Sequence, residues 1–267
     1  MHDRLSVHSV TFHGDPLAEL HDRWSQLGLT RLSLIDTQLS DPALTPLLAT
    51  HGYRIDAVYH LFGAGRVPAT GEECRAARDA LDRLVDAAAG LGTRMIYMLT
   101  GGRGAMSWRH AADRFCAAVA PCAERARQAG VALAIENASS LYADLHIAHS
   151  LRDTITLAEM AGVGICIDLF HCWAEADLPD LVDRALPRTE LVQLSDYVLG
   201  DRSLPARAVP GDGAIPVEPF VDQVLAGGYA HGFDLELIGP RIEAEGRAAA
   251  ARRACVHVGA LLDRLGT

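Results

Sequence analysis

The strongest constraint on how this chain can fold is a series of eight short apolar stretches, which are separated by longer amphipathic ones. The short stretches have the length and the apolar, partly β-branched composition of buried strands. Two of the longer stretches, 72–92 and 108–130, repeat apolar residues every three or four positions and close on glycine, as helices packed against a sheet do. The sequence therefore predicts strands at residues 5–12, 31–35, 54–61, 94–99, 131–136, 163–168, 191–196 and 233–237.

This alternation of strands and helices predicts the α/β fold class and a single (β/α)8 TIM barrel. A chain of 267 residues is an ordinary length for such a barrel, so we expect one domain over residues 1–267. The irregular segment 198–216, rich in glycine, proline and aspartate, follows the seventh predicted strand. Loops after strands form the active-site face of a TIM barrel, so we expect the site at the C-terminal ends of the strands.

The composition narrows the classes of function. The 24 basic residues are all arginine, which excludes Schiff-base chemistry through lysine and the phosphate-binding loop that requires it. The formal charge of −10 argues against a nucleic-acid partner. No stretch of about 20 apolar residues and no signal sequence are present, so we expect a cytoplasmic protein without a membrane partner. The six cysteines lack CxxC spacing, which favours reduced, buried thiols over a structural zinc site.

Four of the later predicted strands carry an oxygen-bearing side chain near their C-terminal ends: Glu136, Asp168, Gln193 and Glu236. In a TIM barrel these strand ends meet at one face, so the four side chains are expected to converge. Carboxylates packed together in a low dielectric repel one another, and a divalent cation is the simplest way to keep them ionised. Carboxylate and amide oxygens are hard ligands, so we expect one ion, Mn²⁺ or Mg²⁺ rather than Zn²⁺, with Mn²⁺ the first choice.

The ordered set of motifs resembles the xylose-isomerase-like TIM-barrel superfamily, which contains the sugar phosphate isomerase and epimerase family. The motifs are Glu136, then "DLFH" with Asp168 and His171, then "VQLSD" with Gln193, then "PGDG", then Glu236. The resemblance implies that Glu136, Asp168, Gln193 and Glu236 bind the metal and that His171 contacts the substrate. Many members have histidine where this chain has Gln193, and a glutamine at this position is similar to some dehydratases of the group.

The interpretation we favour is an isomerase or epimerase that moves a proton next to a carbonyl of a sugar, sugar phosphate or related polyol ketone through an enediolate. Glu136 and Glu236 would remove and return the proton. If the enolate instead expels a β-hydroxyl group, the same site is a dehydratase, a lyase acting on a dehydroshikimate- or inosose-like ketone, with His171 as the proton shuttle.

Two other functions are less expected. One is a barrel that binds a sugar without converting it, and the other is an apurinic-site endonuclease. A multinuclear zinc site would need more histidine, yet the fourth predicted strand end, "YMLTGG", has none. Together with the acidic charge, this argues against the endonuclease branch.

Four further residues are candidates for substrate binding. Arg202 and Arg207 in the 198–216 segment could hold a carboxylate, a phosphate or a pair of hydroxyls, although loop arginines are equally often solvated. His60 lies near the end of the third predicted strand, and Trp173 could form an apolar wall against a sugar face; packing is an equally good interpretation of both. Asp196 could orient Gln193 or cap the loop. A homo-oligomer is expected from the resemblance alone.

Overall fold

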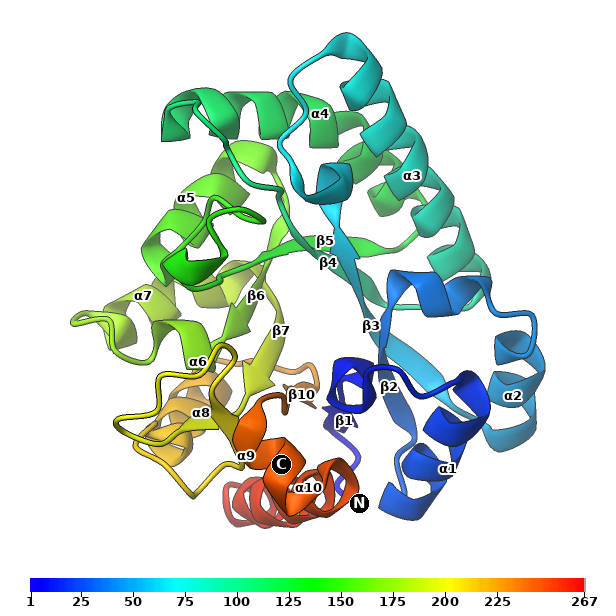
Figure 1. Cartoon of the computed structure of the whole chain (residues 1–267), viewed down its shortest axis with the longest axis vertical. Helices are drawn as coiled ribbons and strands as arrows, with labels where there is room; N and C mark the ends of the chain where they lie inside the picture. Colours follow the sequence, from blue (N-terminus) through cyan, green and yellow to red (C-terminus); the bar gives the residue numbers. More distant parts are fainter. Residues whose placement is uncertain (267) are drawn as a thin grey trace. The chain divides into compact units, whose positions relative to one another are not determined.

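The computed structural model describes residues 1–266 and confirms the expected barrel of parallel strands with flanking helices (Figure 1). Eight strands form one sheet, in the order β1 (Leu5–Val7), β10 (Phe233–Leu235), β7 (Thr189–Leu194), β6 (Gly164–Asp168), β5 (Ala132–Glu136), β4 (Met95–Leu99), β3 (Arg54–Leu61) and β2 (Arg31–Ile35). The pairs β1–β10, β10–β7, β3–β4, β4–β5 and β5–β6 are parallel. A parallel bridge between His8 and Ser33 links the two ends of this order, so the barrel is nearly closed.

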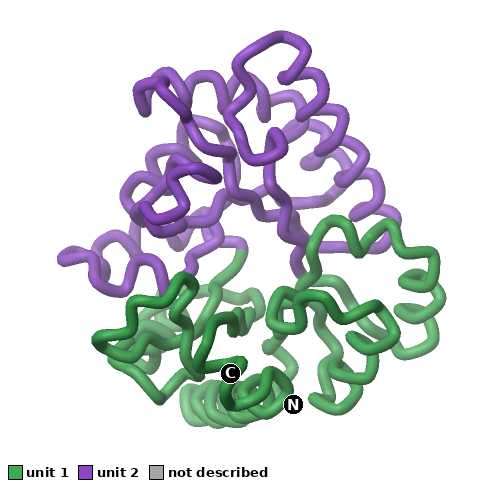
Figure 2. The backbone as a smooth tube through the Cα atoms, viewed as in Figure 1, with its two compact units in different colours: residues 1–56, 191–267 green, residues 57–190 purple. Residues whose placement is uncertain are grey.

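The chain divides into two compact units (Figure 2). The first unit contains residues 1–56 and the chain from Leu191 onward, and the second contains Ala57–Glu190. Helices of the first unit are α1 (Leu17–Leu27), α2 (Leu44–His51), α8 (Val217–Ala226), α9 (Pro240–Glu245) and α10 (Arg247–Arg264). Helices of the second are α3 (Gly71–Gly90), α4 (Trp108–Gln128), α5 (Leu151–Ala161), α6 (Leu169–Cys172) and α7 (Leu178–Ala185).

Local sequence explains where the helices begin and end. Thr70 and Glu73 form a capping box at the start of α3, because the Thr70 hydroxyl accepts from Glu73 N at 3.2 Å and the Glu73 carboxylate accepts from Thr70 N at 2.9 Å. Ser107 caps α4, because its hydroxyl accepts from His110 N at 3.3 Å. Gly130 follows α4 with a φ of 73°, a left-handed conformation that glycine adopts without strain. The two helices predicted from periodicity are confirmed.

Six predicted strands differ from the observed ones: β4, β5 and β6 each begin one residue later than predicted, and three others differ at their C-terminal ends. The first ends at Val7, because His8 Nδ1 accepts from Val10 N at 2.9 Å and starts a short 3-10 helix, Ser9–Phe12. The strand predicted at 191–196 becomes β7 followed by β8 (Asp196–Tyr197), and β8 pairs antiparallel with β9 (Arg207–Ala208) inside the irregular segment. The last strand ends at Leu235, so Glu236 follows it directly.

Two negative expectations concern the thiols and the membrane. All six cysteines are free, and four of them are buried, as expected of reduced thiols. Within residues 1–266, no helix combines the length and the apolar character that a bilayer span requires.

Candidate functional site

Glu136, Asp168 and His171 form a buried cluster in the second unit. Glu136 is the last residue of β5 and Asp168 the last of β6, and these two strands pair in parallel. His171 lies three residues later in α6, with its Nε2 3.5 Å from Asp168 Oδ2. Glu136 is 5% exposed and Asp168 0% exposed, and each of the three residues offers a ligand atom within 4.8 Å of the other two. Two carboxylates and an imidazole in such a space make a suitable set of ligands for a divalent cation.

The side chain of Asn137 ties the ends of β5 and β6 together. Its Nδ2 donates to Asp168 O at 2.8 Å, and its Oδ1 accepts from Asp168 N at 2.9 Å. Both bonds are buried, and Asn137 is 0% exposed. These two hydrogen bonds satisfy the backbone N–H and C=O groups of Asp168. They fix its position relative to Glu136, the residue next to Asn137.

His146 fixes the backbone of Glu136 from the other side. Its Nδ1 accepts from Thr100 N at 3.1 Å, so the proton lies on Nε2, which is 2.8 Å from Glu136 O and donates to it. Burial lowers the pKa of His146 to about 3, with a smaller contribution from His149. A neutral imidazole with one defined tautomer therefore holds the strand end that carries Glu136.

Cys172 and two aromatic rings complete the surroundings of Asp168 and His171. The Cys172 thiol donates to Asp168 O at 3.4 Å, and burial raises the pKa of this thiol well above its usual range, so it stays protonated. Tyr142 and Phe170 meet the His171 ring edge-on, with centroid distances of 5.8 and 5.1 Å. His171 is thus oriented by packing as well as by Asp168.

His60 and Trp173 lie in the second unit. His60 is buried at the C-terminal end of β3, paired in register with Met98 of β4. Trp173 caps the C-terminal end of α6, where its backbone N–H donates to Leu169 O. It lies two residues after His171 and is half-buried. Contact of either residue with a substrate stays a prediction.

In the first unit, buried Gln193 and Arg207 form a second group with Glu236, whose side chain is 13% exposed. Gln193 Nε2 donates to Glu236 Oε2 at 2.9 Å, and an Arg207 nitrogen lies 3.1 Å from Glu236 Oε1. Arg207 also donates to Ser195 Oγ at 3.1 Å, and its side chain is 3% exposed. A buried guanidinium with these partners is held in one position. A residue that orients an anionic or hydroxyl-rich substrate needs such a fixed position.

Arg202 differs from Arg207. It is exposed, and its NH1 group donates to the hydroxyl of Tyr197 at 2.8 Å and to Asp201 O. These contacts hold the start of the irregular segment. A role for Arg202 in substrate binding stays a prediction.

Asp196 caps the irregular segment, the second of its two expected roles. Its carboxylate accepts from the backbone N–H groups of Tyr197, Gly211, Gly213 and Ile215, at 2.8 to 3.0 Å. The four backbone N–H groups therefore occupy both oxygens of the Asp196 carboxylate. The segment is therefore held in a defined shape, and this shape places Arg207 in β9, opposite Tyr197 of β8.

We expect Gly213→Ala to loosen the irregular segment. A Cβ at this position would lie 2.3 Å from Tyr197 O and 2.4 Å from Asp196 Oδ1, so the loop must move. The free energy of unfolding should fall by about 1–3 kcal/mol, as for other overpacked sites, and limited proteolysis should cut within 198–216. Gly90→Ala in α3 is the matched control, because its Cβ would enter open space. A variant as resistant to protease as the wild type contradicts the capping role of Asp196.

Sequence similarity places the chain among known proteins. The model of the xylose isomerase-like TIM barrel family matches residues 8–256. The chain belongs to this family. No curated protein matches it in sequence. The family assignment confirms the resemblance drawn from the motifs at Glu136, Asp168, Gln193 and Glu236.

Solved structures share the xylose isomerase-like fold at low identity. A protein from Sinorhizobium meliloti 1021 has a TM-score of 0.83 and 23% identity, covering 98% of both chains. The IolI protein, whose structure holds a bound zinc atom, has a TM-score of 0.82 and 13% identity, covering 99% of both. L-ribulose 3-epimerase has a TM-score of 0.79 and 20% identity, covering 98% of this chain and 95% of its own. At these identities the likeness shows the fold.

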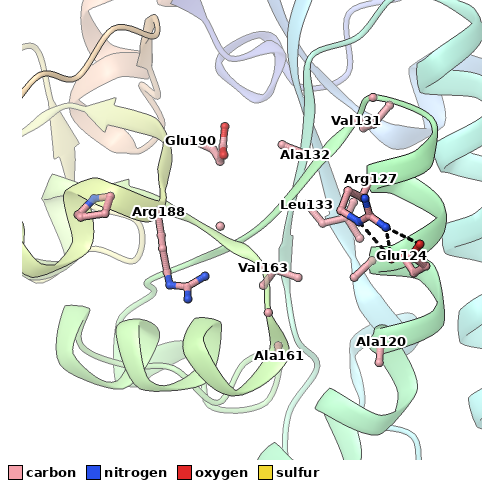
Figure 3. Close-up of a pocket in the computed structure, with 15 residues that line it drawn as sticks. Ala120, Glu124, Arg127, Val131, Ala132, Leu133, Ala161, Val163, Arg188 and Glu190 are labelled. Atoms are coloured by element: carbon pink, nitrogen blue, oxygen red, sulfur yellow. Dashed lines mark hydrogen bonds and ion pairs between the residues drawn. The ribbon is translucent and has the colours of Figure 1, made fainter.

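A hollow of about 600 Å³ lies in the second unit (Figure 3). Its lining does not include Glu136, Asp168 or His171. It is lined by the residues that precede and begin β5 and β6, including Val131, Leu133 and Val163, with Arg188 and the Glu124–Arg127 ion pair at its sides. In a TIM barrel the N-terminal ends of the strands serve stability and the C-terminal ends carry the chemistry. We therefore do not assign the reaction to this hollow.

The sequence interpretation missed several residues that support the site, namely Asn137, His146, Ser195 and Asp234. Asn137 directly follows Glu136, so a polar residue just beyond a strand-end acid was a usable signal. The other three carry no local pattern, because their partners lie on distant strands or loops.

Proposed function

We propose that the chain is a divalent-metal-dependent isomerase or epimerase that moves a proton next to a carbonyl of a small sugar-like compound. The observation that carries this proposal is the buried cluster of Glu136, Asp168 and His171, whose ligand atoms lie within 4.8 Å of one another. Family membership supports a site at the C-terminal strand ends, where this cluster lies.

We propose that Glu136, Asp168, Gln193 and Glu236 hold the ion. The first two belong to the second unit and the last two to the first unit. Their oxygen donors suit Mn²⁺ or Mg²⁺, and the nearby imidazole of His171 is a donor that Mn²⁺ also accepts. When bound, the ion would act as a Lewis acid on a carbonyl oxygen and the neighbouring hydroxyl of the substrate.

The residues have separate proposed tasks. Glu136 takes the proton from the substrate carbon, and Glu236 returns a proton, which gives an epimer if it reaches the same carbon and an isomer if it reaches the neighbouring one. His171, oriented by Asp168 and the edges of two aromatic rings, moves a proton at a substrate oxygen. Arg207, buried beside Glu236, holds a substrate hydroxyl pair, carboxylate or phosphate.

Two measurements test this function. Isothermal titration of chelator-treated protein should show one Mn²⁺ site, with weaker binding of Mg²⁺. A panel of ketoses, ketose phosphates and cyclic polyol ketones is then incubated with the Mn²⁺-loaded protein in deuterium oxide and followed by proton NMR. We expect deuterium to replace one hydrogen next to a carbonyl, and chelator to stop the exchange. Tight metal binding without exchange anywhere in the panel would favour a sugar-binding protein instead.

The same spectra test a dehydratase as the second candidate. The specific observation in its favour is Gln193, whose place in the motif set is similar to that in some dehydratases. A dehydratase would produce an olefinic proton signal and lose a hydroxyl group, whereas an epimerase keeps the number of hydroxyl groups unchanged.

A further inference from the structure

Asp234 is a buried carboxylate that the proposed mechanism does not use. It lies in β10, two residues before Glu236, and is 0% exposed. Three neutral donors from the first unit reach it: Ser6 Oγ at 2.7 Å, Ser33 Oγ at 2.8 Å and Gln193 Nε2 at 3.4 Å. Within residues 1–266 no arginine or histidine forms an ion pair with it. A buried carboxylate without a cationic partner costs free energy, so its presence calls for a task.

The task concerns the amide of Gln193. Carboxylates accept hydrogen bonds but, when ionised, cannot donate them. Two carboxylate oxygens, Asp234 Oδ2 and Glu236 Oε2, face the same end of this amide. That end must therefore be the NH2 group, and the carbonyl oxygen Oε1 must point away from both acids. The two carboxylate acceptors therefore determine which end of the Gln193 amide carries the nitrogen.

Glu236 alone is a poor anchor for this orientation. Its other oxygen lies 3.1 Å from the guanidinium of Arg207, and it is itself a proposed ligand and proton carrier. Asp234 has no such competing role, because its remaining partners are the hydroxyls of Ser6 and Ser33. It is the acceptor that can keep the amide in place while Glu236 changes partners.

We propose that Asp234 is a positioning residue, which orients the Gln193 amide so that Oε1 is the atom offered to the ion. This inference rests on the proposed metal site. A neutral residue at 234 that can also donate would let the amide turn and present its NH2 group, which cannot bind a cation. Loss of such supporting partners typically lowers metal affinity by about 10- to 100-fold.

A double-mutant cycle, read by isothermal titration with Mn²⁺, tests the role of Asp234. Asp234→Asn should weaken Mn²⁺ binding by about 10- to 100-fold when Gln193 is present. In Gln193→Glu the side chain has an oxygen at either end, so no orientation is needed. There Asp234→Asn should cost nothing, or improve binding by removing a like charge. Ser33→Ala, which removes another donor to the same oxygen, is the matched control and should bind as the wild type does.

The outcomes separate this inference from the proposed function. Wild type without Mn²⁺ affinity overturns the proposed metal site itself. Wild type that binds, with Asp234→Asn unchanged, overturns only the role of Asp234. An equal loss in both backgrounds means that Asp234 is merely structural, and loss of binding in Gln193→Glu also counts against the proposal, because an oxygen donor remains. If Asp234→Asn does not fold, Asp234→Ser, smaller and able to donate or accept, replaces it in the same cycle.

Discussion

Glu136→Gln is expected to lower the rate of deuterium exchange into substrate by about 10²- to 10⁴-fold, the usual cost of losing a general base. The amide keeps the size of the side chain at the end of β5 but cannot take up a proton, and it is a weaker ligand. Mn²⁺ affinity, measured by titration, should fall together with the rate. The backbone contacts of residue 136 with His146 do not involve the side chain, so the fold should persist.

Glu124→Gln is the control for this variant. Glu124 lies on the exposed face of α4 and pairs with Arg127, and exposed pairs of this kind contribute little. It should exchange deuterium and bind Mn²⁺ at wild-type levels. If Glu136→Gln does the same, Glu136 is neither base nor ligand, and the proposed mechanism is wrong.

Asn137→Leu is expected to destabilise the protein strongly. It leaves the buried N–H and C=O groups of Asp168 without the two bonds at 2.9 and 2.8 Å. The N–H group is left unsatisfied at a cost of about 1–3 kcal/mol, whereas Asp168 O keeps the Cys172 thiol as a donor. The free energy of unfolding should therefore fall by about 1–3 kcal/mol in urea titrations. The Mn²⁺ affinity should fall as well, because Asp168 loses its fixed position.

A surface amide provides the comparison. Gln128→Leu at the end of α4 removes an exposed bond to Glu124 and should change the free energy of unfolding by less than about 0.5 kcal/mol. Equal stability of Asn137→Leu and Gln128→Leu would show that the tie between β5 and β6 is unimportant.

Much of the fold could be predicted because it depends on periodicity. Apolar runs and helical spacing located β2 and β3 at their observed ends and α3 and α4 within two residues. Prediction failed at the ends of β1, β7 and β10, where single side chains decide. His8, for example, turns the chain into a 3-10 helix by accepting a backbone N–H, and no window of hydrophobicity contains that bond.

The sequence predicted the strand-end acids, Gln193 and His171 of the candidate site, but not the residues that support them. Glu136 and Asp168 stand out because acids at the ends of buried strands are rare, and the structure brings both together with His171. Asn137 and Asp234 act through partners 31 and 41 residues away in the chain, Asp168 and Gln193, and such pairs leave no trace in one sequence. Arg207 was predicted as a loop residue, and the short β8–β9 ladder that holds it was not.

The contacts of residues 136–138 have a consequence for engineering the substrate range. His146 donates to Glu136 O, Ala138 N donates to Ala148 O, and the Asn137 side chain donates to Asp168 O. These hydrogen bonds hold both ends of the loop after β5 in fixed positions. The tip between the two ends carries Leu141, 67% exposed, and Tyr142, whose ring meets His171. A library randomised at the tip alone should alter which ligands fit while the acids below keep their places.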